Sequence, residues 1–173
     1  MAVGAMTGKG ILPLHKIPGS TKVNSDYYIA KVLKPIIEQQ LPKLYKNELH
    51  KVVIHHDQAS SHMSNATEAY AAEIKEKLGV TILFKEDIPL KGPDVSPLDF
   101  FGFRYIKQRF NCHKKMTLDG AWKALKSEWN KVSAATCKRV IESWKRRLRL
   151  IPRLRGYHIE PRVQINRIRI RRN

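Results

Sequence analysis

Apolar side chains recur at helical spacing along much of this chain. A capping cluster, Asn24-Ser25-Asp26, opens the first of these repeats, the second starts at Ser64 and the last starts at Ser133. Gly79 supplies a stop signal after the second repeat. Pro35 is expected to bend the first helix. The pattern predicts helices over residues 24–42, 64–78, 98–110, 118–132 and 133–152.

Three shorter apolar runs predict β-strands, over residues 11–17, 51–55 and 80–84. The run Lys-Val-Val-Ile-His at 51–55 is expected to be a buried strand, because both of its faces carry apolar side chains. Predicted strands and helices alternate along the chain. This order predicts an α/β sheet domain.

Two helices carry apolar stripes that predict core packing rather than a cofactor site. The stripe of the helix over 118–132 consists of Leu118, Trp122, Leu125, Trp129 and Val132. In the last helix, Val140, Trp144 and Leu148 are expected to face inward and the Lys and Arg residues outward. Pro152 is expected to end or bend that helix, because proline costs about 3 kcal/mol in a helix interior.

Composition adds a strong charge signal to this pattern. The chain has 173 residues, 42% of them hydrophobic, which suits one domain or one domain with an appendage. No apolar run approaches the roughly 20 residues that span a bilayer, and the start has no secretory-signal pattern. The formal charge of +18 indicates a polyanionic partner, with nucleic acid favoured and an acidic membrane surface as the alternative.

The positive charge is concentrated at the C-terminal end. Residues 145–173 contain eleven Lys and Arg and one acidic residue, Glu160, for a net charge of +10. The final segment alternates apolar and basic residues, which fits either a strand with one basic face or an arm that orders on nucleic acid. A merely solvated, solubilising tail is the competing interpretation. The residues assigned to nucleic-acid binding are Lys145, Arg146, Arg147, Arg149, Arg153, Arg155, Arg162, Arg167, Arg169, Arg171 and Arg172.

The chain has two cysteines, Cys112 and Cys137, which are too few for a disulfide scaffold. Both are interpreted as small buried residues. A zinc site is a third interpretation, and it rests on His50, His55, His56, His62, Cys112 and His113. The histidines and cysteines lack the CxxC or HxxxH spacing of such sites, so this interpretation is disfavoured.

Two carboxylates stand where an α/β domain places its chemistry. Asp57 directly follows the strand over 51–55, and Asp99 follows a proline-rich loop at the start of the helix over 98–110. Two carboxylates at one sheet edge could hold Mg²⁺, which prefers oxygen ligands. The geometry alone leaves a plain alternative open, in which each residue serves a turn or a helix cap.

Several residue strings, in order along the chain, resemble the Tc1/mariner superfamily of transposases. VVIHHDQASSH is similar to the second catalytic block of that family, and GPDVSPLDFFGF to its third. LPLHKIPG and VNSDYYIAKVLKPII resemble the strand and the helix that precede the second block. RGYHIEP resembles the segment that closes the domain, so the likeness extends from about residue 3 to residue 158.

The resemblance implies an RNase H-like catalytic domain with three metal-binding carboxylates. By match, Asp57 is the second carboxylate and Asp99 the third, and both would bind Mg²⁺ or Mn²⁺ in DNA strand cleavage and transfer. Asp94 matches a motif position outside the triad and is expected to support its loop. His62 matches another motif position and is expected to support the metal site without touching the metal.

The resemblance also implies that one carboxylate is missing from these residues. The first catalytic Asp belongs on a strand ahead of residue 1, so we expect an incomplete RNase H-like sheet and an incomplete metal site. Whether the chain acts as an enzyme is therefore left open. The alternative is a non-enzymatic, domesticated DNA-binding protein that acts through its basic tail.

The expected organisation has three parts. Residues 1–112 form the truncated catalytic core, residues 113–158 its C-terminal helical part, and residues 159–173 a basic arm. The expected partners are DNA and a second copy of the chain, with no membrane and no small-molecule substrate. Clusters of Arg and Lys in the tail, together with the DNA partner, suggest a nuclear location.

Overall fold

The computed structural model describes residues 1–84, 86, 96–111, 113 and 117–154. These residues belong to two compact units. Unit 1 contains Met1–Gly4 and Leu14–Lys91, and unit 2 contains Ala5–Pro13 and Gly92–Asn173. No helix of the described residues has the length and apolar character needed to cross a membrane.

Unit 1 opens with two short strands. Strand β1 (Ala2–Val3) pairs antiparallel with β4 (His15–Lys16), with Ala2 opposite Lys16. The backbone N–H of Ile17 donates to the carbonyl oxygen of Met1, which extends the pairing. The sequence pattern predicted no strand before residue 11, because the glycine-rich start shows no regular alternation of apolar and polar residues.

The first predicted helix is present, but it is built from several unlike turns. Helix α1 (Ser25–Tyr28) begins at Asn24, whose side chain accepts a hydrogen bond from the Tyr27 N–H, as predicted. Two π-helical turns follow, over Ile29–Leu33 and Pro35–Gln40, and then α2 (Leu41–Tyr45) and a 3₁₀ turn, Lys46–Lys51. Proline has no N–H to donate, which suits the change of turn type at Pro35. The buried face of this segment consists of Tyr28, Val32, Leu33, Ile36, Ile37 and Leu41.

A parallel strand–helix–strand unit follows. Strand β5 (Val53–Ile54) pairs parallel with β6 (Thr81–Ile82), and helix α3 (Asn65–Leu78) connects them. The helix ends at Gly79, which adopts the left-handed φ of 73°. A Cβ at Gly79 would lie 2.7 Å from Cβ of His50, so this position requires glycine on two counts.

The prediction of a fully buried strand at 51–55 is wrong. Val52 is buried, but Val53 is 59% exposed. In the described residues β5 has one paired neighbour, β6, and its sheet has two strands. A strand with one covered face alternates between buried and exposed side chains, and β5 follows that rule.

Unit 2 begins with a second antiparallel pair. Strand β2 (Met6–Thr7) pairs with β3 (Gly10–Ile11) across a two-residue turn. The strand predicted over 11–17 is thus wrong as one continuous element, because Ile11 ends β3 and β4 begins only at His15. The indole N–H of Trp129 donates to the carbonyl oxygen of Leu12 at 2.7 Å in a buried position. This hydrogen bond joins the hairpin to the helices of unit 2.

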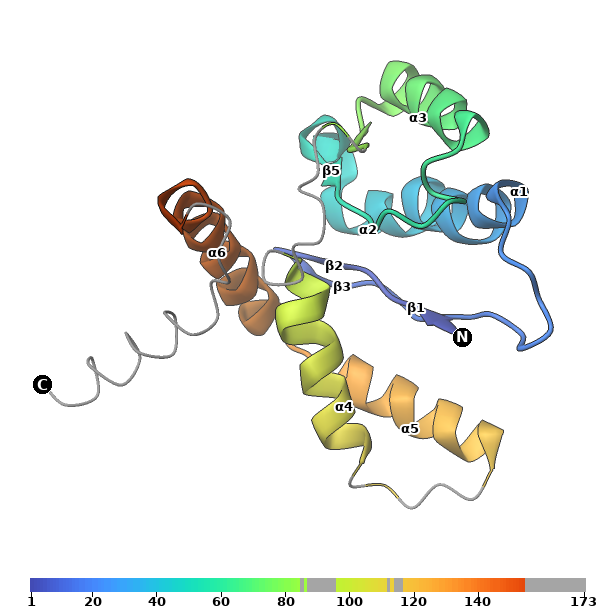
Figure 1. Cartoon of the computed structure of the whole chain (residues 1–173), viewed down its shortest axis with the longest axis vertical. Helices are drawn as coiled ribbons and strands as arrows, with labels where there is room; N and C mark the ends of the chain where they lie inside the picture. The colour runs from blue at the N-terminus through green and yellow to red at the C-terminus, as the bar shows by residue number, and fades with distance from the viewer. Residues whose placement is uncertain (85, 87–95, 112, 114–116, 155–173) are drawn as a thin grey trace, which may run out of the picture. The chain divides into compact units, whose positions relative to one another are not determined.

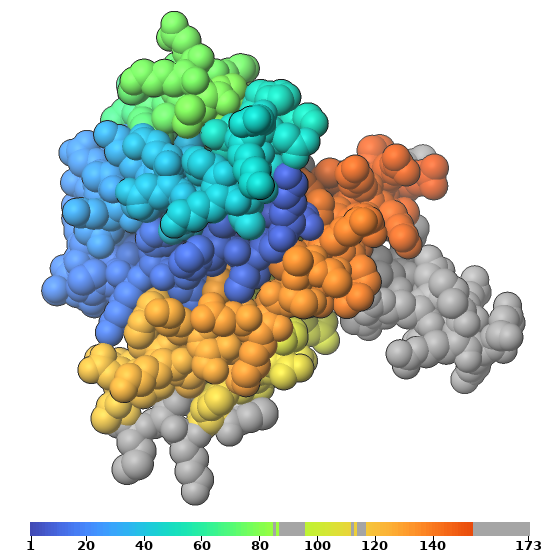
Figure 2. Space-filling view, turned by 180° about the vertical axis from the view of Figure 1, so that it is seen from behind, coloured from blue at the N-terminus to red at the C-terminus, as the bar shows by residue number. Residues whose placement is uncertain are grey.

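Two helices of unit 2 pack together around a buried carboxylate. Helix α4 (Arg104–Phe110) and helix α5 (Leu118–Asn130) lie side by side (Figures 1 and 2). Glu128 is buried on α5, and its Oε1 lies 2.9 Å from Nε2 of His113 and 2.5 Å from Nζ of Lys131. Hydrogen bonds from these groups hold the pKa of Glu128 below its ordinary value. The carboxylate therefore stays ionised and ties α5 to the end of α4.

Helix α6 (Ala134–Leu150) completes unit 2 and contacts β2 and β3. Ser133 caps it as predicted, and the helix ends just before Pro152, also as predicted. Two assignments to the apolar stripes are wrong, because Leu118 is 89% exposed and Leu148 is exposed as well. Both residues lie near helix ends, where the stripe continues beyond the elements that cover it.

Candidate active site

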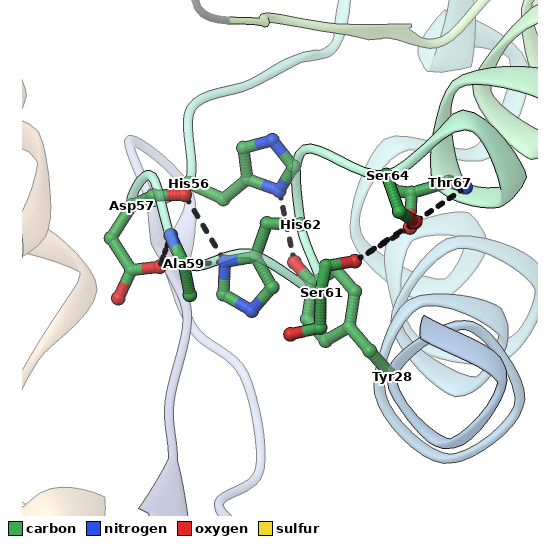
Figure 3. Close-up of polar contacts among 8 residues, drawn as sticks. All are labelled: Tyr28, His56, Asp57, Ala59, Ser61, His62, Ser64 and Thr67. Atoms are coloured by element: carbon green, nitrogen blue, oxygen red, sulfur yellow. Dashed lines mark hydrogen bonds and ion pairs between the residues drawn. The ribbon is translucent and has the colours of Figure 1, made fainter. Parts of the chain in front are cut away.

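Asp57 stands in the loop that joins β5 to α3. Its Oδ1 accepts a hydrogen bond from the backbone N–H of Ala59 at 3.2 Å (Figure 3). This short ring between a side chain and the backbone two residues later is an Asx turn, which fixes the side-chain rotamer. The Asp57 side chain is nevertheless 78% exposed. The loop thus presents the carboxylate to solvent in a defined orientation.

His62 is the main partner of Asp57. Its Nδ1 lies 2.6 Å from Oδ1 of Asp57 and 3.1 Å from the Asp57 carbonyl oxygen (Figure 3). The backbone N–H of His62 donates to the Ala59 carbonyl oxygen at 2.8 Å, which closes the loop from both sides. The hydrogen bond from His62 holds the pKa of Asp57 below its ordinary value. Asp57 is therefore ionised at neutral pH.

Two side chains behind the loop hold the His62 ring. The Tyr28 ring, from α1, stacks on His62 with 3.8 Å between ring centroids. The Tyr28 hydroxyl is hydrogen-bonded to Nδ1 of His56 at 3.0 Å, and the His56 ring lies nearly parallel to the His62 ring with 5.1 Å between centroids (Figure 3). Burial lowers the pKa of His56 to about 4, and the neighbouring His62 acts in the same direction. His56 is therefore a neutral support at physiological pH.

The far end of the loop is locked to the start of α3. Ser64 caps the helix, because its hydroxyl accepts from the Thr67 N–H at 3.3 Å. The Thr67 hydroxyl, fully buried, donates to the Ser61 carbonyl oxygen at 2.8 Å. The sequence signal for the cap was clear, but the link from Thr67 back to the loop was not predicted.

Asp99 has a different setting, in unit 2. It is exposed and lies in the π-helical turn Leu98–Phe103, which runs directly into α4. Its backbone N–H donates to the Ser96 carbonyl oxygen at 3.0 Å. Gly102 is buried in the same turn, and a Cβ there would lie 3.0 Å from the Leu98 side chain. π-Helical turns are rare and frequently mark functional positions.

The aromatic neighbours of Asp99 hold that turn in place. The guanidinium of Arg147, from α6, lies 4.0 Å from the ring centroid of Phe100. Phe101 stacks on Tyr105 with 5.4 Å between centroids. Asp99 is thus positioned by contacts that reach across unit 2, whereas Asp57 is positioned by its own loop.

The assignment of Arg147 to nucleic-acid binding is not supported by its position, because the side chain is 8% exposed and packs on Phe100. A basic run in the sequence does not reveal which member turns inward. The assigned residues Lys145, Arg146, Arg149 and Arg153 are exposed. The assigned residues Asp94, Arg155, Arg162, Arg167, Arg169, Arg171 and Arg172, and also Cys112, lie outside the described residues.

The donor chemistry at Asp57 fits a divalent cation in part. Oδ1 is engaged by His62 and Ala59, while the described residues supply no hydrogen-bond partner to Oδ2. In the part of the chain that the structure describes, no three His, Cys, Asp or Glu side chains come together to hold a metal ion. Asp57 belongs to unit 1 and Asp99 to unit 2, and each is described within its own unit.

Comparison with known proteins defines the fold. A pre-cleavage Mos1 transpososome matches with a TM-score of 0.73 and 17% identity, over 89% of this chain and 43% of that one. The catalytic domain of Mos1 mariner transposase matches at 0.70 and 15% identity, over 91% of this chain and 82% of that one. A Mos1 paired-end complex with the left transposon end matches at 0.72 and 17% identity, over 90% and 43%. Structures of the Mos1 catalytic domain with Raltegravir and Mg or Mn match as well.

The chain therefore has the RNase H-like fold of a transposase catalytic domain. More narrowly, this fold is that of the Tc1/mariner type, as the resemblance of its sequence blocks predicted. The chain spans less than half the length of the transposase in the Mos1 transpososome. No protein-family model and no curated protein sequence matches it.

Proposed function

We propose that these residues form part of a Tc1/mariner-type transposase catalytic domain, in which Asp57 and Asp99 are two of three metal-binding carboxylates. The observation that carries the proposal is the Asp57 loop, which presents an ionised, exposed carboxylate directly after strand β5 of this fold. A third carboxylate would come from a strand outside this sequence. Among the residues that the structure describes, the pair of β1 with β4 and the pair of β5 with β6 in unit 1 are separate two-stranded sheets, which supports the proposal of a further strand between them.

Each side chain has a defined task in this proposal. Asp57 and Asp99 would hold Mg²⁺ or Mn²⁺, and the bound metal would activate a water or a 3′-hydroxyl and stabilise the leaving oxygen. His62 keeps Oδ1 of Asp57 occupied and leaves Oδ2 accessible. Tyr28 and His56 keep the His62 ring from turning away. The 173 residues alone are expected to be catalytically incomplete.

Binding of Mn²⁺, read by its electron paramagnetic resonance, tests the site without requiring catalysis. We expect weak binding to the wild-type chain and weaker binding to Asp57→Asn and Asp99→Asn. Asp26→Asn is the matched control, since Asp26 is an exposed carboxylate outside the proposed site. Equal binding by all four proteins would contradict the assignment. Nicking of transposon-end DNA by the wild-type chain with Mg²⁺, abolished by Asp57→Ala, would contradict the incompleteness.

A second candidate function is DNA binding without catalysis. The exposed Lys145, Arg146, Arg149 and Arg153 favour it, because they add positive charge along and just after α6. Phosphate contacts of this kind give affinity that falls steeply with salt and depends little on sequence. Deletion of residues 161–173 should then lower both the affinity and the salt dependence. An unchanged salt dependence would contradict this function.

The proposal also covers the binding partner, the oligomeric state and the cellular location of the protein. DNA is the partner, in line with the transposon end in the matching Mos1 complex. A homodimer and a nuclear location complete the proposal, and sedimentation and the localisation of a tagged full chain would test them.

A further inference from the structure

Phe103 is the one Phe, Tyr or Trp side chain of the described residues that is exposed. It is 54% accessible to solvent, whereas the other aromatic side chains of its turn are engaged. Phe100 lies under Arg147, and Phe101 stacks on Tyr105. The guanidinium of Arg109 covers the Tyr105 ring at 4.8 Å. Contacts within unit 2 thus explain the positions of the neighbouring rings, whereas the Phe103 ring faces solvent.

The surroundings of Phe103 are chemically specific. Asp99 precedes it by one turn in the same π-helical segment, and both residues are exposed. Arg104 at the start of α4 and Lys107 in its last turn are exposed as well. Residues 96–111 carry three cations and one acid, so this stretch is positively charged overall. An apolar ring beside exposed cations is the arrangement by which proteins hold a single nucleic-acid strand.

We propose that Phe103 stacks on an unpaired nucleobase of a DNA strand held beside Asp99, while Arg104 and Lys107 contact the flanking phosphates. The inference rests on the proposed function, because it takes Asp99 as part of the cleavage site and DNA as the partner. The base must be unpaired, since a ring on a helix surface cannot reach the face of a base inside a stacked duplex. Stacking needs only a π-face, so we expect little preference among the four bases.

The test compares two DNA probes with the full chain. One is a blunt duplex, and the other carries a single-stranded 3′ overhang. Phe103→Ala should weaken binding of the overhang probe about 5- to 150-fold, the range typical of one stacked base, and leave the blunt duplex within about twofold. The salt dependence should stay unchanged, because no phosphate contact is lost.

Three further variants make the result specific. Phe103→Trp should keep the affinity, and its added indole fluorescence should be quenched by the overhang probe. Lys107→Ala should lower the salt slope by about 0.7–0.9 on the overhang, as the loss of one phosphate contact predicts. Leu118→Ala, at an exposed apolar residue of the same unit, should change neither probe.

The outcomes separate this inference from the proposed function. Normal DNA binding that Phe103→Ala leaves unchanged, or weakens equally on both probes, would overturn the stacking alone. Failure of the wild-type chain to bind either probe would overturn the DNA partner and the stacking with it. If Phe103→Ala instead converts a dimer to a monomer in sedimentation, the ring belongs to an interface between copies and the inference is wrong.

Discussion

Asp57 and Asp99 are both exposed, but different kinds of contact hold them in place. The orientation of Asp57 depends on residues within a few positions of it, chiefly Ala59 and His62. That of Asp99 depends on a turn held by the Phe100 ring, whose partner Arg147 comes from a later helix. A local loop retains its geometry when distant parts of a unit change, whereas a turn held by long-range packing does not. The geometry around the two carboxylates should therefore respond differently to mutation.

The largest change in the free energy of unfolding is expected in unit 1, around the Asp57 loop, at acidic pH. The pKa of His56 is about 4 in the folded chain and about 6.5 when unfolded, so below pH 6.5 the unfolded state binds the extra proton. Neutral His56 therefore contributes about 3 kcal/mol to the free energy of unfolding. This contribution is complete above pH 6.5 and is lost as the pH falls to 4. Urea unfolding of unit 1 across this range, compared with His56→Asn, measures it.

The exposed His50 supplies the control for that series. His50→Asn should keep the wild-type dependence on pH, and His56→Asn should flatten it. Parallel pH curves for the wild-type chain and His56→Asn would show that His56 titrates in the folded chain as it does in the unfolded one.

The next largest change in stability is expected in unit 2, around the turn that contains Asp99. Arg147→Ala removes a buried cation–π contact and its packing, which should lower the free energy of unfolding of unit 2 by about 2 kcal/mol. Arg146→Ala, at the exposed neighbour, should stay within about 0.5 kcal/mol. Chemical denaturation measures both. Equal losses in the two variants would mean that the Phe100 contact stabilises nothing.

The same pair separates structure from nucleic-acid binding. Arg146→Ala should lower the slope of DNA affinity against salt by about 0.9, and Arg147→Ala should leave that slope as it is. A lowered salt slope in Arg147→Ala would show that Arg147 contacts DNA after all.

A smaller effect is expected at the helix caps of the two units. Ser64→Ala should destabilise unit 1 by about 1 kcal/mol and Ser133→Ala should destabilise unit 2 by a similar amount. Only Ser64→Ala should also alter the amide signals of residues 57–62 in NMR spectra, because Ser64 bonds to Thr67, which holds the loop. Shifts of the Asp99 amide in Ser64→Ala would contradict the local character of the Asp57 loop.

The smallest effect is expected in the Asp57–His62 pair itself. The pair is largely exposed on the Asp57 side, so His62→Gln should change stability by less than about 1 kcal/mol. The pKa of Asp57 should nevertheless rise toward its ordinary value, because the hydrogen bond that lowers it is gone. Titration of the Asp57 carboxyl carbon by NMR would show this, and an unmoved pKa would assign the shift to other groups.

Much of the fold could be predicted because its signals are local. The caps at Asn24, Ser64 and Ser133 and the stop at Gly79 are choices of a single residue at a helix end, and the structure has each where the sequence predicted it. The position of Asp57 after a strand was equally readable. These features need no knowledge of distant contacts.

The other features of the fold and the site depend on contacts between residues that are far apart in the sequence, and no sequence pattern shows which of them meet. Arg147 lies in a run of basic residues, and its contact with Phe100, far away in the sequence, distinguishes it from its exposed neighbours. The contacts of the Tyr28 ring with His56 and His62 join α1 to a loop that lies far from it in the sequence. Leu118 fits the helical period and still lies exposed, because the period says nothing of where the covering element ends.

Val53 has a consequence for the behaviour of the protein at high concentration. Among the described residues, β5 is a short strand with an exposed β-branched side chain and one paired neighbour, and such a strand offers a template to other chains. The +18 charge opposes such contact at low ionic strength, and salt screens that repulsion. Colloidal stability should therefore decrease as salt is added, the reverse of ordinary salting-in, and Val53→Lys should restore it.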